Sequence, residues 1–467
     1  MHIAPTLDPT TLLWFTQDLR LHDNAAIEYV NQLTDDHKHR LLCLYCIDST
    51  WFEKDHFGNR SMGERRWQFL LESLRELAHG LQKLGQQLIV AKGIPSDIID
   101  DILSRYAITT VVASQQTGYH EQQTWASLKV QHAHLPFVNI DTFTLFSESQ
   151  LPFSFGQLPT SFSQFRQSIE SNDETQQALQ SMGALLTPMP QTLPSVLHIT
   201  LREKHQYRVS ADSTTSTYKT FHGFSGGEQQ GWSQLKEYFS GNAPSHYKET
   251  RNALGCEKEE WQLSSKFSAW LANGCLSARQ IVSAVNDYEQ QHGANRSTYW
   301  IVFELLWREY FQCYARQHGR LLFFRKGLQK KAPLASFYPQ RFQQWCHGNT
   351  PWPLVNACMK QLNQTGFLSN RGRQIVASCL IYELDLDWRC GAAYFEQQLV
   401  DYDVAANWGN WQYIAGVGAD PRGGRRFNIE KQQQLYDPEK RFITHWQGEA
   451  NTAIAIDSVD AADWPLS

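Results

Sequence analysis

Several residues that could do chemistry are concentrated between positions 370 and 413, in a segment that is otherwise largely apolar. Arg373 lies near its start, and Asp401, Asp403 and Asn407 lie near its end. Apolar residues recur around Arg373 at helical spacing, which predicts a helix with one buried face. Buried charges need partners. Two interpretations follow: an Arg–Asp pair that braces two helices, or a polar cradle for a flat cofactor beside redox-active indoles.

A second polar group stands at the start of another predicted helix and consists of Ser264, Ser265, Lys266 and Ser268. Hydroxyl and free backbone N–H groups at such a position suit a phosphate or pyrophosphate. They suit ordinary N-capping equally well. Tyr247 and Arg251, in the preceding HYKETRN stretch, would favour the phosphate interpretation if they converged on the same point.

A third group places Glu304, Trp307 and Arg308 at neighbouring helical positions. The carboxylate and the indole could together hydrogen-bond and stack on a nucleobase. The alternative is an amphipathic helix in which Glu304 pairs with Arg308 at i,i+4 spacing.

The composition bounds the class of protein that these groups belong to. The chain has 467 residues, of which 42% are hydrophobic and 19% charged, which is typical of a globular protein with two or three domains. Its net charge of −5 argues against nucleic-acid binding by overall field and leaves a local basic groove open. Aromatic residues are abundant, and 16 of them are Trp.

Neither a metal site nor a membrane anchor is expected. Cys43 and Cys46 form a CxxC inside an apolar run that reads as a buried strand, and no second ligand pair follows at zinc spacing. The N-terminal residues lack the pattern of an export signal, and no apolar run reaches 18 residues. We therefore expect free thiols and a cytoplasmic protein.

The elements that position these groups divide the chain into parts. Residues 1–145 alternate helical stretches with apolar runs at 11–15, 40–48, 87–93, 109–114 and 137–141. This predicts an α/β domain with a doubly wound parallel sheet. The usual GxGxxG dinucleotide fingerprint is missing after the first strand, so a dinucleotide site should lie elsewhere.

The rest of the chain is predicted to be helical apart from a connector and a tail. Residues 146–225 are rich in Ser, Thr, Gln and Pro and read as a long connector with helical turns at 162–170. An all-α domain is expected over 226–448, followed by a flexible tail at 449–467. Its helices are predicted at 228–239, 266–271, 277–290, 297–317, 355–364, 371–383 and 392–399.

The order of these segments resembles the photolyase/cryptochrome family. The similarity rests on SSKFSAWLANGCLSARQ, STYWIVFELLWREYF, TPWPLVNACMKQLNQTGFLSNRGR and DYDVAANWGNWQYIAGVGADPRGGRRFN. YKETRN before the first of these, LPTSFSQFRQSIE in the connector and Tyr413, where DNA photolyases usually carry tryptophan, are similar to the DASH-type cryptochromes. The resemblance covers roughly residues 10–445.

The resemblance implies an antenna domain followed by a helical domain that holds FAD in a folded pose. The flavin phosphates would be held by Tyr247, Ser264, Ser265, Lys266 and Ser268. Arg373 and Asp401 would pair over the isoalloxazine ring, with Asp403 and Asn407 near its polar edge.

It also implies residues for a DNA lesion. Glu304 and Asn370 would point toward the lesion bases, and Trp307 and Tyr413 would flank them. Basic residues outside the pocket would hold phosphates, or form solvated loops instead: Arg325, Lys326, Lys330, Lys331 and the run 422–426.

For photoreduction the family suggests a tryptophan chain in which Trp411 is proximal and Trp388 is the middle member. The outer position falls on Ala335, where the family has tryptophan, so either Tyr338 or Trp345 ends the chain or photoreduction is impaired.

For the antenna, DASH-type proteins commonly bind 5,10-methenyltetrahydrofolate. Glu121 stands at the position of the carboxylate that contacts the folate, or is a surface glutamate at a helix start.

The function implied is blue-light-dependent repair of cyclobutane pyrimidine dimers by excited reduced FAD, with a preference for single-stranded DNA. RNA or looped duplex DNA are further substrates to consider, and a monomer is expected. A lesion must be flipped to reach a buried cofactor, and a single strand avoids most of that cost. The alternatives are a blue-light receptor that binds FAD and nucleic acid without repair, and a single-strand-binding or RNA-binding flavoprotein with an incidental light response.

Overall fold

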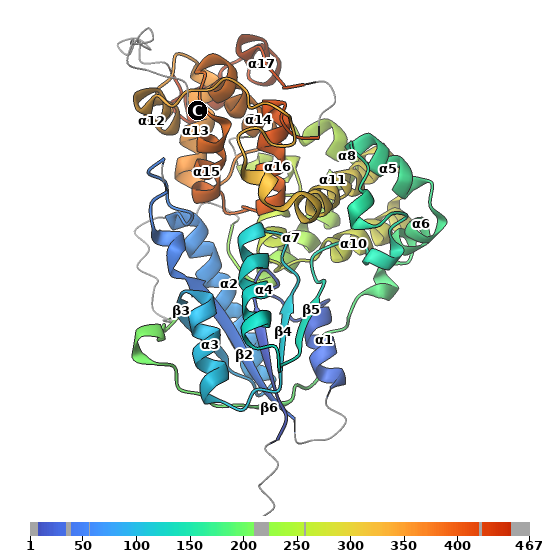
Figure 1. The fold of residues 1–467 in the computed structure, drawn as a ribbon. Helices are drawn as coiled ribbons and strands as arrows, with labels where there is room; N and C mark the ends of the chain where they lie inside the picture. The colour runs from blue at the N-terminus through green and yellow to red at the C-terminus, as the bar shows by residue number, and fades with distance from the viewer. Residues whose placement is uncertain are drawn as a thin grey trace, which may run out of the picture.

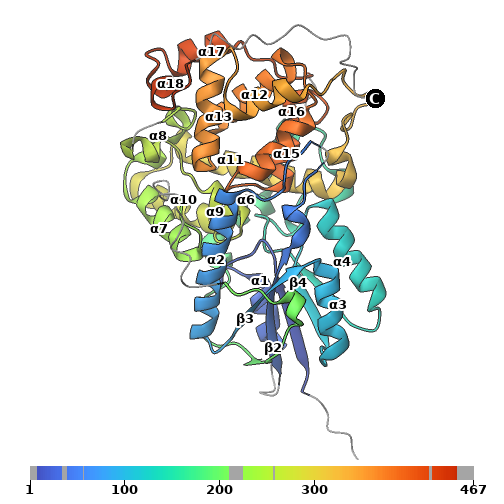
Figure 2. The same ribbon diagram turned by 90° about the vertical axis from the view of Figure 1, so that its left-hand side faces the viewer.

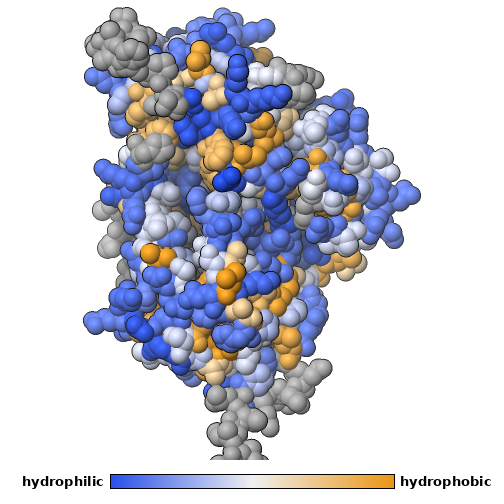
Figure 3. Space-filling view, in the orientation of Figure 1, coloured by the Kyte–Doolittle hydropathy of each residue, from blue (hydrophilic) through white to orange (hydrophobic). Residues whose placement is uncertain are grey.

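The computed structural model describes residues 8–33, 39–55, 57–209, 224–255, 258–419 and 423–449. It has a sheet domain at one end and a helical domain at the other, with the connector running along both (Figures 1 and 2). The predicted tail, from residue 450 onward, lies outside the described residues. The face seen in Figure 3 is largely hydrophilic, with small separate apolar groups.

The sheet is parallel, with the strand order β3-β2-β1-β4-β5. Its strands are β1 (Thr10–Phe15), β2 (Arg40–Asp48), β3 (Leu88–Gly93), β4 (Thr110–Ser114) and β5 (Phe137–Ile140). All five predicted strands are therefore confirmed. A two-residue strand from the connector, β6 (Ser195–Val196), pairs with β2 and was too short for its pattern to reveal.

Both faces of the sheet are covered, which explains why its strands are almost continuously apolar. Leu13 and Phe15 pack in one core with α1 (Ala25–Gln32) and α2 (Glu64–Lys83). Leu12 and Trp14 face the opposite core, under α3 (Pro95–Arg105) and α4 (Tyr119–Gln131). The strand order reverses between β1 and β4, so the carboxyl edge there is a topological switch point.

The connector contains more helix than its composition indicated. Helix α5 (Phe162–Glu170) agrees with the predicted turns, and α6 (Asp173–Gln180) follows it almost at once. Asn172 caps α6 by accepting from the Thr175 N–H, a signal that the polar sequence around it concealed. Figure 1 shows α5 and α6 at one side of the helical domain.

The helical domain begins with α7 and its helices surround one core. They are α7 (Glu228–Ser240), α8 (Ala243–Thr250), α9 (Ser268–Ala272), α10 (Ala278–His292), α11 (Arg296–His318), α12 (Pro339–His347), α13 (Pro353–Thr365), α14 (Asn370–Ser378), α15 (Trp388–Gln398), α16 (Val404–Ala415), α17 (Ile429–Tyr436) and α18 (Arg441–His445).

Each predicted helix is present, with several differences in limits, the largest of which is at α15, which begins at Trp388 and not at residue 392. Helix α9 begins at Ser268, two residues later than predicted, because Lys266 adopts a left-handed backbone with φ 58°. The helix predicted over 371–383 becomes a π-helical turn at Cys379–Glu383. Helices α8, α12, α16, α17 and α18 were not predicted. Of these, α16 contains Trp, Asn and Gly, and apolar residues surround it, so it has no one-sided periodicity.

Candidate functional site

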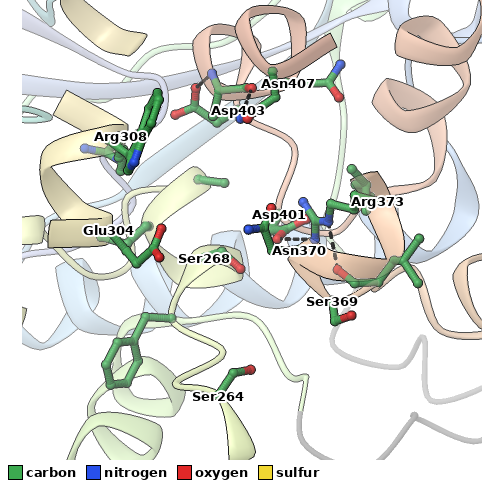
Figure 4. Close-up of a pocket in the computed structure, with 18 of the residues that line it drawn as sticks. Ser264, Ser268, Glu304, Arg308, Ser369, Asn370, Arg373, Asp401, Asp403 and Asn407 are labelled. Atoms are coloured by element: carbon green, nitrogen blue, oxygen red, sulfur yellow. Dashed lines mark hydrogen bonds and ion pairs between the residues drawn. The ribbon is translucent and has the colours of Figure 1, made fainter. Parts of the chain in front are cut away.

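A cavity of about 490 Å³ lies in the helical domain and is lined from α8, α9, α11, α14, α15 and α16. Every predicted lesion and cofactor residue lines it: Glu304, Trp307, Asn370, Tyr413, Tyr247, Ser264, Ser265, Lys266, Ser268, Arg373, Asp401, Asp403 and Asn407. Figure 4 shows Glu304 and Arg373 on opposite walls, with Asp403 and Asn407 at one end and Ser264 at the other. Residues far apart in sequence thus form one polar-lined pocket.

Arg373 and Asp401 form an ion pair in the wall of this cavity. Arg373 Nη2 is 2.7 Å from Asp401 Oδ2, and its Nε donates to the Leu368 carbonyl at 2.7 Å. The pair joins α14 to the turn between α15 and α16, so it does brace two helices. Because both residues also line the cavity, the bracing pair is at the same time part of the cavity wall. The other oxygen, Asp401 Oδ1, is buried with no partner among the described residues.

Asp403 and Asn407 are held at one end of the cavity by α16. Asp403 caps this helix, since its Oδ1 accepts from the Ala406 N–H at 2.9 Å. Its Oδ2 accepts from the Gln312 side chain at 2.7 Å. Asn407 donates to the Ala392 carbonyl at 3.0 Å, which fixes its amide plane. Gln312 is a partner that sequence reasoning did not identify, because nothing in the α11 pattern distinguishes it from a core residue.

The opposite end of the cavity contains a cation without a carboxylate partner among the described residues. Lys266 Nζ donates to the Trp261 carbonyl at 3.0 Å and to Ser264 Oγ at 2.7 Å. Burial lowers the pKa of Lys266 to about 7. Tyr247 is buried beside Ser265, and its pKa is raised above the ordinary tyrosine value by burial. A buried ammonium surrounded by hydroxyl groups suits an anionic ligand.

Glu304 has different partners from those that simple helical spacing suggests. Arg251 Nε donates to its Oε1 at 3.0 Å, and Trp300 Nε1 donates to the same oxygen at 3.2 Å. Burial raises the pKa of Glu304, although the Arg251 charge opposes that rise. The alternative prediction, an i,i+4 pair between Glu304 and Arg308, is therefore wrong. Arg308 instead donates to the Phe143 carbonyl at 2.7 Å.

Two aromatic rings meet at right angles in the same cavity. Trp307 and Tyr413 have ring centroids 5.9 Å apart, at an interplanar angle of 78°. Arg425 Nη2 donates to the Tyr413 hydroxyl at 2.7 Å. Phe162 of the connector covers Trp307, with ring centroids 3.7 Å apart. The serine-rich and proline-rich connector gave no sign of this contact, which arises only from the tertiary fold.

The two tryptophans predicted for electron transfer are both buried. Trp411 lines the cavity, whereas Trp388 lies behind it and donates its N–H to the Arg325 carbonyl at 3.0 Å. Ala335 is also buried. Trp345 lies against Trp411 at 6.3 Å between ring centroids.

A second cavity, of about 600 Å³, opens at the carboxyl edge of the sheet, between the two domains. Glu121, an exposed residue of α4, lines it, as do side chains at the ends of β1, β2, β4 and β5. Arg66 and Glu396 line it from α2 and α15. Ligands of doubly wound sheets bind at such a crevice, so Glu121 is in a position to contact one.

The predicted basic residues are mostly exposed. Lys326, Lys330, Lys331 and Arg426 are exposed, and Arg325 is half-buried. Arg426 pairs with Glu383 at 3.2 Å, so its charge is partly neutralised. Arg422 lies outside the described residues.

Over the described ranges, no three His, Cys, Asp or Glu side chains form a group that could hold a metal ion. Eight cysteines in that part of the chain are free and buried. Among the helices described, none is long and apolar enough to cross a membrane.

Known proteins share both the sequence and the fold. Residues 11–188 match the DNA photolyase family, and residues 300–457 match the FAD binding domain of DNA photolyase. A cryptochrome DASH of Idiomarina loihiensis is 47% identical over 97% of this chain and 96% of its own length. One from Vibrio parahaemolyticus is 45% identical over 98% and 97%.

Solved structures agree with these similarities. A Synechocystis cryptochrome is 37% identical and superimposes with a TM-score of 0.84, covering 95% of this chain and 89% of its own. A class III photolyase of Agrobacterium tumefaciens is 25% identical, with a TM-score of 0.75 and coverage of 96% and 88%. The chain therefore belongs to the photolyase/cryptochrome family, and within it to the DASH-type cryptochromes.

Proposed function

We propose that this chain binds FAD in the 490 Å³ cavity and uses blue light to repair cyclobutane pyrimidine dimers, preferably in single-stranded DNA. The observation that carries this proposal is that one cavity brings together a buried ammonium for phosphates, an Arg373–Asp401 pair, and a Glu304 carboxylate beside an indole. The ammonium and the ion pair suit the cofactor, and the carboxylate with its neighbouring indole suits a flipped pyrimidine pair.

The residues present fit FAD. Lys266 has no carboxylate partner among the described residues, and its neighbouring hydroxyl groups would hold the flavin phosphates with it. Asp401 Oδ1 is a buried acceptor that a ring N–H or a ribose hydroxyl would satisfy. Arg373 and Asn407 would contact the isoalloxazine, and Asn407 would influence its protonation near N5. When bound and reduced, FAD supplies on illumination the single electron that splits a dimer.

Glu304 and Asn370 would hold the lesion bases. The Glu304 carboxylate is fixed by Arg251 and Trp300, so it presents a preorganised acceptor to the base edges. Its raised pKa follows from burial, which also strengthens any hydrogen bond that it makes. Asn370, the first residue of α14, adds an amide on the other side of the cavity.

Trp307 and Tyr413 would form an aromatic corner around the flipped bases. Stacking of a base on an aromatic ring contributes about 1–3 kcal/mol. Tyrosine offers a smaller ring than the tryptophan usual in DNA photolyases, so stacking recovers less of the free energy needed to open a duplex. A single strand lacks most of that cost, which is the physical basis of the proposed preference. RNA and looped duplex regions share this advantage.

Outside the cavity, basic side chains would hold the phosphate backbone. Lys326, Lys330 and Lys331 are exposed, and their charges would make binding fall with rising salt. These lysines form a local basic region on a chain whose net charge is negative. We propose that the protein carries out this repair as a monomer in the cytoplasm.

For the antenna, we propose that 5,10-methenyltetrahydrofolate binds in the second cavity with Glu121 as a polar contact. The absorption spectrum of purified protein tests this. A near-UV band in addition to the flavin bands, absent from Glu121→Gln, supports the antenna. A spectrum of flavin alone after incubation with the folate would contradict it.

The competing function is a blue-light receptor that binds nucleic acid without repair. Glu304, Trp307 and Asn370 are all present in the cavity, which favours repair chemistry. One experiment distinguishes the two functions. The reduced protein is illuminated with dimer-containing single-stranded and duplex oligonucleotides, and thymine recovery is measured. Faster thymine recovery on the single strand supports the proposal. No recovery on either substrate would favour the receptor, and equal rates would remove the strand preference.

A further inference from the structure

The photoreduction chain needs a member beyond Trp388, and Ala335 cannot supply it because an alanine side chain cannot be oxidised. Trp388 itself is a poor place for the chain to end. It is about 1% exposed, and its N–H is donated to the Arg325 carbonyl oxygen at 3.0 Å. A carbonyl oxygen is too weakly basic to remove a proton from an oxidised indole. Oxidised Trp388 would therefore keep its positive charge and take its electron back.

Trp408 of α16 contacts Trp388 outside the first cavity. The two ring centroids are 5.8 Å apart and the rings are inclined by 77°. Trp408 does not line the 490 Å³ cavity, in contrast to Trp411 in the same helix. Helix α16 therefore carries one indole in the cavity wall, Trp411, and one outside it, Trp408, which contacts Trp388.

The Trp408 N–H has a proton acceptor that the Trp388 N–H lacks. Trp408 Nε1 is 3.3 Å from Glu396 Oε2 and 3.2 Å from the Tyr402 hydroxyl. Glu396 in turn lines the second cavity, at the interface with the sheet domain. The indole is thus connected through one carboxylate to an open pocket.

The other aromatic candidates do not continue from Trp388. Trp345 is fully buried, and its tryptophan contact is Trp411, the member nearest the flavin site. Tyr338 lies under the Arg341 guanidinium at 4.4 Å, a cation that disfavours a positive charge on the ring. Neither has a ring contact with Trp388 among the described residues, whereas Trp408 does.

We propose that Trp408 is the outer electron donor of this chain and that Glu396 accepts its indole proton. Photoexcited oxidised flavin held in the cavity would be the oxidant. Once Trp388 has lost an electron by way of Trp411, Trp408 passes one electron to the Trp388 radical cation. Trp388 is reduced and Trp408 is oxidised. The Nε1 proton moves to Glu396 Oε2, leaving a neutral Trp408 radical and a neutral carboxylic acid. An external one-electron donor such as a thiol then restores Trp408, and the proton returns.

The surroundings of Glu396 support this role. Burial raises its pKa, which makes the carboxylate a stronger base, and the Glu121 charge acts in the same direction. The Arg66 charge lowers the pKa of Glu396 and so favours the ionised form, which can accept a proton. Arg66 also donates to the Glu396 main-chain oxygen at 3.1 Å and lies 4.3 Å over the Tyr402 ring.

Flash photolysis of the flavin-loaded protein without DNA tests the proposal. The measured quantities are the absorption of tryptophan radicals, which differs between the cation and the neutral form, and the yield of lasting flavin reduction. In Trp408→Phe we expect rapid charge return and a several-fold lower yield. In Glu396→Gln the amide oxygen still accepts the indole N–H but cannot take the proton, so the radical should persist as the cation.

Two controls separate this outcome from damage to the fold. Trp345→Phe removes another buried indole of the helical domain and should leave the radical spectrum and the yield unchanged. Chemically reduced Trp408→Phe should bind flavin and act on dimers as the unmodified protein does, because Trp408 and Glu396 do not line the first cavity. The proposal rests on the flavin binding proposed above and not on repair, so failure of repair leaves this test intact.

The proposal is overturned if Trp408→Phe keeps the original yield, or if Glu396→Gln still forms the neutral radical at the original rate. It is equally overturned if Trp345→Phe, and not Trp408→Phe, abolishes photoreduction. A protein that binds flavin but shows no photoreduction with an added thiol would contradict it as well, since the relay would then carry no electrons.

Discussion

Phe162 of the connector lies face to face with Trp307 of α11, with ring centroids 3.7 Å apart and an interplanar angle of 13°. Phe162 is itself buried, and its edge contacts Phe303. One face of the indole is therefore taken by the protein, so a ligand has to approach the rest of its surface. A segment with the composition of a linker thus sets the plane of a proposed substrate-stacking residue.

Replacing Phe162 by Leu should weaken lesion binding about three- to tenfold, because an aromatic pair contributes about 0.5–1.5 kcal/mol beyond its buried area. Equilibrium binding of a dimer-containing single strand measures this. Phe165→Leu is the matched control. Phe165 is buried next to it on α5 and contacts Tyr310 but not Trp307. Equal loss of affinity in both variants would mean that the effect is only one of stability.

Lys266 should make flavin binding depend on pH. Burial lowers its pKa to about 7 in the folded protein, from the ordinary lysine value of 10.5. Its contribution to stability is therefore present above pH 10.5 and is lost as pH falls through about 7. A phosphate partner requires the ammonium form, so flavin binding above pH 7 must take up a proton.

We expect the affinity of the flavin-free protein for FAD to fall by up to about tenfold per pH unit above pH 7. Titration calorimetry in buffers of different ionisation enthalpy measures both the affinity and the proton uptake. Lys266→Met should bind FAD more weakly at pH 7 and lose this slope. The same slope in both proteins would show that Lys266 does not contact the phosphates.

Asp401→Asn should release flavin. It leaves the Arg373 charge without its partner in the cavity wall, a change that typically costs about 3–5 kcal/mol for a buried pair. The flavin-to-protein absorbance ratio after gel filtration measures the loss. Asp387→Asn is a matched control, because Asp387 is buried and pairs with Arg389 at 2.7 Å but does not line the cavity. Flavin retained in Asp401→Asn and lost in the control would contradict the proposed cradle.

Tyr413→Trp should raise activity on duplex DNA relative to single strands. A larger ring stacks better on a flipped base, within the range of about 1–3 kcal/mol per stacked base. Tyr413→Phe removes only the hydrogen bond from Arg425 and should leave the duplex-to-single-strand ratio unchanged. Initial repair rates on the same oligonucleotide in both forms give this ratio. A ratio that shifts only in Tyr413→Phe would assign the preference to Arg425 and not to ring size.

The sheet strands and most long helices were predictable because burial leaves a periodic or continuous apolar pattern. The limits of α9 were not, because the left-handed Lys266 is a local conformation that only its tertiary neighbours require. Helix α16 was missed for the opposite reason. It is buried around most of its circumference, and its indoles and amides are placed for contacts on several sides.

The lining of the cavity was predictable from the motifs, but the pairings of its residues were not. The motifs predicted that Glu304, Lys266 and Asp401 matter, and all three line one cavity. The partner of Glu304 proved to be Arg251 and not Arg308, because α8, whose C-terminal cap is Arg251, packs against α11. Contacts between distant segments, such as Phe162 with Trp307, leave no periodic signal in either one.

The most direct measurement of the central claim is a single-turnover experiment. Reduced, flavin-loaded protein in excess is mixed with a single-stranded oligonucleotide that carries one thymine dimer, and the ultraviolet absorbance of the restored thymines is followed under blue light. We predict complete recovery in the light, none in the dark, and a several-fold slower recovery in Glu304→Gln. Bound oligonucleotide with no recovery of thymine absorbance under illumination would contradict the repair function and leave the receptor function in its place.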